Sequence, residues 1–246
     1  DAALKDAYGV TMDQIQTGFD AALDRDFGPL RRSLKKLDIP AGATTGQLTA
    51  LAQSNPDSFA VQMRLAEATQ KAGDTAGAIR ALEKAAQLIP GLQGKQNPNL
   101  MIATLALEKN DTARAIQALD AFLKVDANDA DGARQRAELV EPLGDAARTG
   151  AAYQRVVEVD PFDSHAQTMV GRTALERKDA PTAVHALRAA LATNPPDRAA
   201  AHLDLAQAYF MARQTADAKR EALSALEIAP SFEAAQDLLL KIVGGV

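Results

Sequence analysis

Apolar and small residues recur in a helical rhythm along most of the chain. From residue 59 to residue 232 the apolar positions stand three or four residues apart, as they do on one face of an α-helix. The rhythm stops at Pro90, Pro161, Pro195 and Pro230, and proline cannot continue a helical hydrogen-bond ladder. The pattern therefore predicts a succession of helices that these prolines separate.

The predicted helices form pairs that repeat with a period of about 34 residues. The first helix of a pair carries a large residue followed by a small one, as in Leu65-Ala66, and the second carries the reverse, as in Ala78-Ile79. Five copies are predicted, at residues 59–92, 96–129, 130–163, 164–197 and 199–232.

A turn separates the two helices of each predicted pair. It reads Gly73-Asp74, Asn110-Asp111, Gly144-Asp145 and Lys178-Asp179 in four of the copies. Gly and Asn tolerate the left-handed backbone that ends a helix, and the Asp that follows can cap the next helix. Neither helix of a pair can bury its apolar stripe alone, so stacked pairs should share one core and form an all-α solenoid. The small residues, such as Ala78 and Gly171, should mark close helix crossings.

The two ends of the chain depart from the repeat. Residues 1–40 predict a helical segment capped by Thr11, broken at Gly28-Pro29 and continued by a short basic helix, Leu30–Leu37. Residues 41–58 predict a linker and a half-repeat helix, and residues 233–246 predict a capping helix and tail. One apolar face is expected in each end segment, formed by Met12, Ile15, Phe19 and Leu23 in the first and by Leu238, Leu239, Ile242 and Val243 in the last.

The composition narrows the classes of function. Apolar residues make up 47% of the chain and aromatic residues 4%, the net charge is −5, and there is no cysteine. The acidic balance argues against a nucleic-acid partner, and no apolar run is long enough to span a membrane. The sequence begins at Asp1 without a signal-like segment, so we expect a fragment or a processed product.

No catalytic or cofactor motif is present in the sequence. There is no H-E-x-x-H pair, no glycine-rich phosphate loop and no cysteine nucleophile. His165 and His202 fall near the starts of two successive first helices, where they could approach each other as a metal pair or stand as ordinary exposed histidines. We expect no cofactor, no metal and no enzymatic activity from this chain itself.

The repeat resembles the tetratricopeptide repeat, a 34-residue helix-turn-helix unit with small residues at fixed positions and a closing proline. The resemblance covers residues 59–232, although the aromatic expected early in the first helix is absent and Arg136-Ala137 replaces the large-small pair in the third copy. It implies a right-handed α-solenoid that acts as a scaffold and binds a peptide or a protein partner on its concave face.

The resemblance also implies which residues face a partner, because the first helices line the concave face. The expected partner-binding residues are Met63, Glu67, Leu100, Thr104, Arg134, Glu138, His165, Arg172, Leu203, Gln207, Phe210 and Met211. Arg134 and Arg172 could bind a carboxylate or could pair with Glu138 and Glu176. Leu203, Phe210 and Met211 could form an apolar landing site, although Phe210 and Met211 could instead contact the capping helix.

The opening segment is similar to the region that follows the catalytic domain in bacterial gluzincin-like metallopeptidases of the peptidase MA group. The matching residues are Tyr8-Gly9, Thr11–Phe19 and Arg25–Leu30. This resemblance implies a larger bacterial protein, an exported or periplasmic location and an upstream metallopeptidase domain that the present chain serves as an accessory. Self-assembly through the ends of the solenoid, as a structural repeat protein, is the other alternative.

Overall fold

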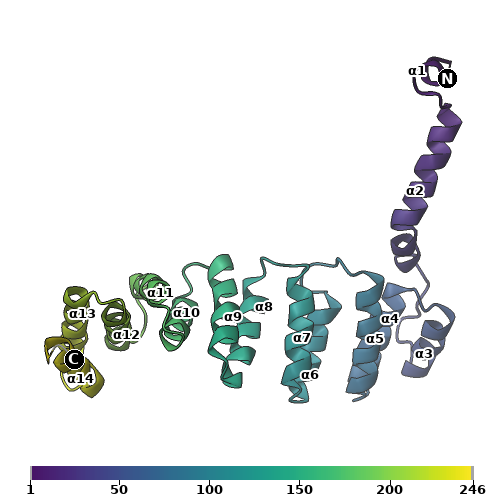
Figure 1. The fold of residues 1–246 in the computed structure, drawn as a ribbon. Helices are drawn as coiled ribbons and strands as arrows, with labels where there is room; N and C mark the ends of the chain where they lie inside the picture. The colour runs from purple at the N-terminus through teal and green to yellow at the C-terminus, as the bar shows by residue number, and fades with distance from the viewer. Residues whose placement is uncertain (1, 245–246) are drawn as a thin grey trace. The chain divides into compact units, whose positions relative to one another are not determined.

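A computed structural model describes residues 2–244, and every regular element in that range is helical (Figure 1). The chain forms two compact units, Asp1–Val125 and Asp126–Val246. Helices of the first unit are α1 (Ala2–Tyr8), α2 (Met12–Ser33), α3 (Thr45–Ser54), α4 (Phe59–Lys71), α5 (Thr75–Leu88), α6 (Pro98–Glu108) and α7 (Thr112–Leu123). The second unit contains α8 (Ala130–Val140), the short 3₁₀ helix η1 (Glu141–Leu143), α9 (Ala146–Val159), α10 (Ser164–Glu176), α11 (Ala180–Ala192), α12 (Arg198–Met211), α13 (Thr215–Ile228) and α14 (Glu233–Gly244).

Each unit is built by stacking helix pairs. α4 packs on α5 and α6 on α7 in the first unit, while α8 with α9, α10 with α11 and α12 with α13 form the pairs of the second. Neighbouring pairs join through α5 and α6, α9 and α10, and α11 and α12. This consecutive packing is the arrangement of an α-solenoid, and it confirms the predicted fold class.

The turns inside the pairs follow the predicted chemistry. The residue before the cap has positive φ in all five pairs, at Gly73, Asn110, Gly144, Lys178 and Arg213. The aspartates that come next cap α5, α7, α9 and α11 by accepting a backbone N–H of the first turn. The exception is α13, where Gln214 occupies the cap position without a side-chain hydrogen bond.

Several of the helices end two residues before a proline. α5 ends at Leu88, before Pro90, and α13 ends at Ile228, before Pro230, because a proline disfavours helical backbone in the residue that precedes it. A contact that the sequence analysis did not anticipate recurs at these corners. The side-chain amides of Gln62, Gln167 and Gln236 each donate to the carbonyl of the proline six residues earlier.

The predicted break at Gly28-Pro29 is wrong, because α2 continues through both residues to Ser33. The ring of Pro29 is compatible with helical φ, and the clash that usually excludes helix before proline involves the Cβ of the preceding residue. Gly28 has no Cβ, so part of this clash is absent. Residues 34–37 lie beyond the helix, so the separate basic helix expected at Leu30–Leu37 does not form.

The C-terminal helix α14 packs against α13 and buries Leu238 and Ile242. Leu239 is partly buried against the same cluster. Val243, which was expected on this face, is 67% exposed, because its position on the helix turns it away from α13.

Small residues lie where the helices of a pair cross. Ala78, Ala115 and Ala183 are fully buried at the starts of the second helices. Gly171 on α10 faces Leu187 on α11 so closely that a Cβ at residue 171 would stand 2.6 Å from the Leu187 Cδ2 atom. That distance is well inside normal van der Waals contact, so α10 can pack on α11 at this distance only with glycine at position 171.

We predict that Gly171→Ala lowers the free energy of unfolding by about 1–3 kcal/mol, because overpacking outweighs the gain in helix propensity. The matched control is Gly46→Ala, since Gly46 also lies in a helix but has nothing within 4 Å of its Cβ position. This control should be neutral or stabilising. Urea unfolding followed by circular dichroism measures both changes, and equal effects of the two substitutions would contradict the assignment.

We predict that Gln214→Asp raises the free energy of unfolding by about 1 kcal/mol, because it supplies the cap that α13 lacks. The reverse change at the matching turn, Asp179→Ala, removes the bond to the Thr182 N–H and should lower stability by about the same amount. Thermal unfolding of the two variants beside the parent chain checks the pair. If the Gln214→Asp variant has no higher melting temperature than the parent chain, the missing cap of α13 does not limit the stability of the protein.

Candidate functional site

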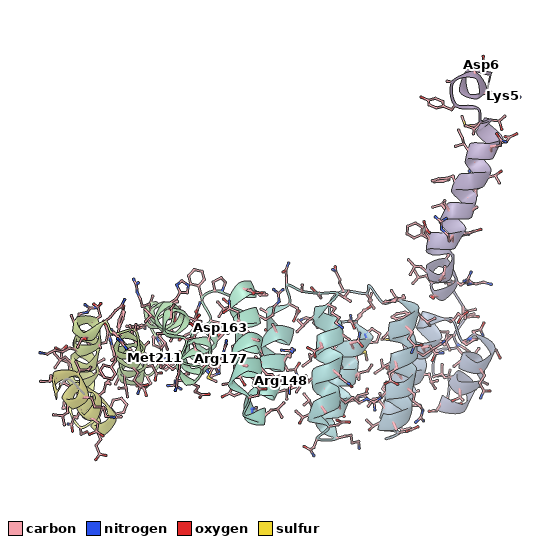
Figure 2. The ribbon with its side chains drawn as sticks, in the orientation of Figure 1. Lys5, Asp6, Arg148, Asp163, Arg177 and Met211 are labelled. Carbon is pink, nitrogen blue, oxygen red and sulfur yellow. The ribbon has the colours of Figure 1, made fainter. Side chains whose placement is uncertain are left out.

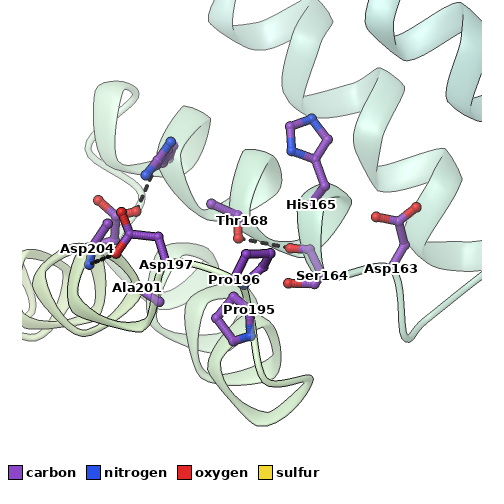
Figure 3. Close-up of a pocket in the computed structure, with 11 residues that line it drawn as sticks. Asp163, Ser164, His165, Thr168, Pro195, Pro196, Asp197, Ala201 and Asp204 are labelled. Carbon is purple, nitrogen blue, oxygen red and sulfur yellow. Dashed lines mark hydrogen bonds and ion pairs between the residues drawn. The ribbon is translucent and has the colours of Figure 1, made fainter. Parts of the chain in front are cut away.

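A groove runs between the N-terminal halves of α10 and α12 in the second unit (Figure 3). Its volume is about 580 Å³. Side chains with hydrogen-bonding groups line it together with two prolines and two alanines. The lining residues are Asp163, Ser164, His165, Thr168, Arg172, Pro195, Pro196, Asp197, Ala200, Ala201 and Asp204.

The repeat itself creates this groove. Asp163 and Asp197 stand one repeat period apart and cap α10 and α12 by accepting the N–H groups of Ala166 and Ala200. Because the two helices begin at corresponding points and contact each other, their first turns lie side by side. Figure 2 shows the side chains over the whole ribbon, with Asp163 labelled at the start of α10.

An ion pair closes one end of the groove. Arg172 Nε donates to Asp204 Oδ2 over 2.7 Å, and the side chains are 47% and 13% exposed. Burial raises the pKa of the Asp204 carboxyl, and the carboxylate of Asp197 raises it further, while Arg172 opposes both effects. Among residues 2–244 Arg172 has this one partner, through Nε, so its terminal guanidinium nitrogens remain available to a ligand.

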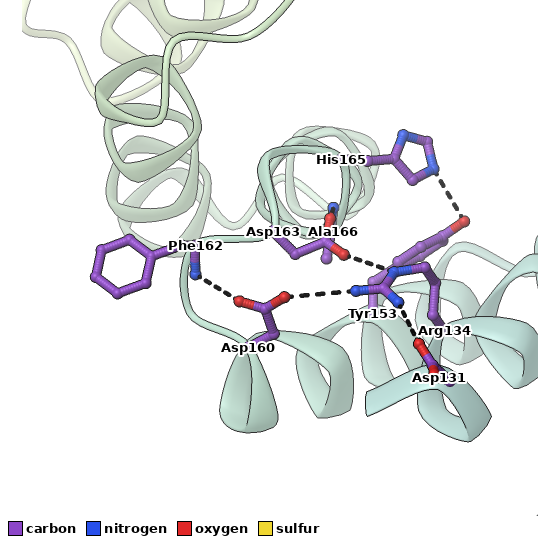
Figure 4. Close-up of polar contacts among 8 residues, drawn as sticks. All are labelled: Asp131, Arg134, Tyr153, Asp160, Phe162, Asp163, His165 and Ala166. Atoms are coloured by element: carbon purple, nitrogen blue, oxygen red, sulfur yellow. Dashed lines mark hydrogen bonds and ion pairs between the residues drawn. The ribbon is translucent and has the colours of Figure 1, made fainter. Parts of the chain in front are cut away.

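Arg134 on α8 has a different environment (Figure 4). Its Nε donates to Asp163 over 2.9 Å, and its terminal nitrogens reach Asp131 at 3.2 Å and Asp160 at 3.4 Å. Burial would raise the pKa of Asp163, but the Ala166 N–H and Arg134 hold it below its ordinary value. Arg134 thus fastens α8 to the loop before α10. Neither arginine has the glutamate partner considered for it, because aspartates bind both guanidinium groups instead.

His165 belongs to a second polar cluster beside Arg134 (Figure 4). The buried hydroxyl of Tyr153 donates to Glu141 over 2.6 Å and lies 3.1 Å from His165 Nε2. The two rings meet edge to face, with their centroids 5.3 Å apart. Burial, then the bond to Glu141, raises the pKa of Tyr153. Since the phenol has one hydrogen, and Glu141 receives it, His165 donates from Nε2 to the phenol oxygen.

The other residues expected on the partner-binding face of this unit have mixed positions. Leu203 is 6% exposed and belongs to the core, so its assignment to an apolar landing site is wrong. It belongs to the same core cluster as buried residues of α13 and α14, and α12 packs on both of these helices. Phe210 packs against that core, whereas Glu138, Gln207 and Met211 are exposed.

The remaining expected residues lie in the first unit and do not contribute to this groove. Glu67 accepts a bond of 2.7 Å from Lys71 and lies 3.6 Å from Arg64. The Thr104 hydroxyl donates to the Leu100 carbonyl on its own helix. Met63 and Leu100 are partly buried.

Three carboxylates of the groove, those of Asp163, Asp197 and Asp204, were missing from the sequence analysis. Asp197 could have been found from its spacing, because aspartate recurs at the same point in the repeat at positions 129, 163 and 197. Asp204 interrupts the apolar stretch of α12, which is a detectable signal. Its partner Arg172 lies on another helix, and no local pattern connects the two.

The two histidines considered as a metal pair have different partners. His202 Nδ1 lies 2.8 Å from Glu221, while His165 bonds to Tyr153. Within residues 2–244 no cluster of three or more His, Asp or Glu side chains is placed to hold a metal ion. A separate search over the same residues finds no helix with the length and apolar character of a membrane span.

Comparison with known proteins identifies the repeat. A family model for the tetratricopeptide repeat matches residues 100–166 and 168–234, more than half of the chain. No curated protein matches the sequence. The comparisons give no support to the resemblance between the opening segment and metallopeptidases, and that interpretation stays a prediction.

Several solved structures are similar to this chain. YrrB, described as a tetratricopeptide repeat protein with an unusual peptide-binding site, is 15% identical, with a TM-score of 0.51 over 79% of this chain and 98% of its own. MamA is 19% identical, with a TM-score of 0.48 over 69% of this chain and 90% of its own. A repeat protein from Parabacteroides merdae is 17% identical, with a TM-score of 0.48 over 76% and 73%.

Tetratricopeptide repeat proteins are in general non-catalytic interaction modules, and no catalytic motif occurs in this sequence. The helix pairs, the turn chemistry and the family match agree. The chain belongs to the tetratricopeptide repeat family.

Proposed function

We propose that this chain is an interaction scaffold that binds an extended peptide segment of a protein partner in the groove between α10 and α12. The observation that carries the proposal is the lining of that groove. Arg172 offers donors, Asp197 and Asp204 offer acceptors, and prolines and alanines offer apolar contacts. An extended peptide has unsatisfied donors and acceptors in alternation along its backbone, so a lining of both kinds suits it.

The two arginines have different roles in this proposal. Arg134 is held by three aspartates and positions the loop that carries Asp163. Arg172 has one carboxylate partner and is about half exposed, so it can turn to a peptide carbonyl or carboxylate without leaving the groove. The match to YrrB, a peptide-binding repeat protein, supports a peptide ligand at the level of the fold.

The further alternatives from the sequence concern the context of the chain. Membership of a larger bacterial protein, with this chain as the non-catalytic accessory of an exported metallopeptidase, rests on Tyr8–Leu30 alone. The groove between α10 and α12 does not depend on that context, because all of its residues lie in the second unit.

We predict that Ala200→Trp raises the Kd for peptides at least about tenfold, a loss of about 1.4 kcal/mol, because the indole fills the groove that Ala200 lines. Linear peptides selected from a random phage-displayed library on the full chain serve as the probe, with Kd measured by fluorescence anisotropy. The control is Ala216→Trp, at an exposed position on α13, which should leave the Kd unchanged. Arg172→Ala should also weaken binding.

The control for folding is the thermal unfolding of each variant. Peptides that bind the parent chain, Ala200→Trp and Arg172→Ala with equal affinity would place the ligand elsewhere and overturn the proposed site.

We predict that Arg134→Met lowers the free energy of unfolding by about 1–3 kcal/mol, because it leaves the Asp163 carboxylate, 11% exposed, without its cation. The control is Asp131→Asn, which removes the partner that is 96% exposed and should change stability by less than about 0.5 kcal/mol. Urea unfolding measures both. An Arg134→Met chain that is as stable as the parent yet no longer binds the selected peptides would show that Arg134 contacts the ligand.

A further inference from the structure

The longest helix of the chain exposes an apolar stripe along its length. Met12, Ile15 and Phe19 are 54%, 43% and 57% exposed, and the stripe continues on the second half of α2 and its C-cap. We call it the α2 stripe, formed by Met12, Ile15, Phe19, Leu23, Phe27, Leu30 and Leu34. Four of its members, including Phe27 at 52% and Leu34 at 59%, are more than half exposed. Apolar surface gathered in this way marks an interaction site.

The local structure of α2 shows that the stripe belongs to a well-formed helix. Thr11 and Gln14 form a capping box, in which the Thr11 hydroxyl accepts the Gln14 N–H and the Gln14 side chain accepts the Thr11 N–H. The helix contacts α5 near its C-terminal end, where Gly28 and Ser33 are buried. Gly28 lies on the side of the helix away from the stripe, whereas Ser33 lies beside Leu30 at the edge of the stripe. The contact with α5 therefore borders the C-terminal end of the stripe and leaves Phe19 and Phe27 exposed.

Five of the seven stripe residues are placed symmetrically about Leu23. Phe19 and Phe27 lie four residues on either side of Leu23, and Met12 and Leu34 lie eleven residues on either side. Two such helices in antiparallel orientation, with Leu23 opposite its own copy, would place each phenylalanine beside a phenylalanine. The same antiparallel arrangement places Met12 of one copy beside Leu34 of the other. The same residues of both copies then form the contact, as in a two-fold dimer.

The charges on α2 favour the same orientation. Its first half carries Asp13 and Asp20 and no basic residue, and Arg31 and Arg32 lie at its C-terminal end. Asp24 and Asp26, near the centre, already pair with Arg31 and Arg25 of the same chain, at 2.9 and 2.8 Å. An antiparallel partner therefore brings Arg32 towards Asp13, whereas a parallel partner would bring like charges together.

We propose that two copies of this chain pair through the α2 stripe, antiparallel, on a two-fold axis at Leu23. The helix has 22 residues and a length of about 33 Å. Full burial of the exposed parts of the stripe in both copies would remove on the order of 1,000 Å² from water, which suits a reversible dimer rather than an obligate one. This surface is separate from the ends of the repeat array, where the sequence led us to expect self-association, and from the peptide groove.

The first test is the mass of the full chain in solution, measured by sedimentation equilibrium from about 1 µM to about 500 µM. We expect the mass to rise from 26.0 kDa towards twice that value. Phe19→Glu should raise the dimer dissociation constant at least about tenfold. The matched control is Phe162→Glu, at an 82% exposed phenylalanine in the second unit, which should leave it unchanged. A parent chain that stays monomeric throughout, or equal effects of the two changes, would overturn the proposal.

The second test fixes the orientation and uses the absence of native cysteine. Leu23→Cys should form a disulfide-linked dimer on mild oxidation, because the two-fold axis places the residue opposite itself. Met12→Cys should not cross-link alone, but should cross-link when mixed with Leu34→Cys. If Met12→Cys links to itself as readily as Leu23→Cys does, the pairing is parallel and the antiparallel dimer is excluded.

Discussion

The contact between Gly171 and Leu187 illustrates the constraint on which the repeats depend. Two helices of a pair can share a core only if their axes come close, and a side chain larger than hydrogen at residue 171 would meet Leu187 first. Elsewhere in the array alanine fills the corresponding positions and is fully buried. Close approach then lets residues such as Tyr153, Phe122 and Leu82 fill the space between pairs. The low fraction of aromatic residues therefore does not prevent a close-packed interior.

The capping aspartates connect this packing to the groove. Asp163 ends the loop before α10, accepts the Ala166 N–H and receives Arg134 from the preceding pair. One carboxylate thus starts a helix and fixes the spacing between pairs. Asp197 starts α12 in the same way but has no arginine at the corresponding point, since its counterpart of Arg134 is Thr168, whose hydroxyl bonds to its own helix. The groove lies between α10 and α12, where no arginine at residue 168 bonds to Asp197.

The sequence predicts local features of the fold well and contacts across helices poorly. The turn at Asn110-Asp111 was predictable because a left-handed residue and a helix cap depend on adjacent side chains. The sequence did not predict a helix through Gly28-Pro29 because proline normally disfavours helix in the residue before it. Part of that clash involves the Cβ of the preceding residue, and Gly28 has no Cβ. The prediction for Leu203 was wrong because α12 packs on both α13 and α14. Sequence spacing alone does not distinguish the buried face of α12 from its exposed face.

The site follows the same division. His165 and Arg172 were predicted from the repeat register and both line the groove. Asp204 was not, because its role depends on which residue of α10 stands opposite, a distance of 32 residues along the chain. The three aspartates around Arg134 and the one beside Arg172 were likewise not predicted, since a glutamate one turn away on the same helix offered each arginine a simpler local pairing.

The α2 helix lies outside the logic of the repeats, and that difference is informative. The repeat helices bury most of their large apolar residues, whereas α2 leaves Phe19 and Phe27 largely in water. Most helical stability in proteins comes from packing of the apolar face. Pairing with a second copy would cover that face. The capping box already fixes the residue at which the helix begins. The stability of α2 and the association of two chains would then be linked by mass action, so that concentration controls both.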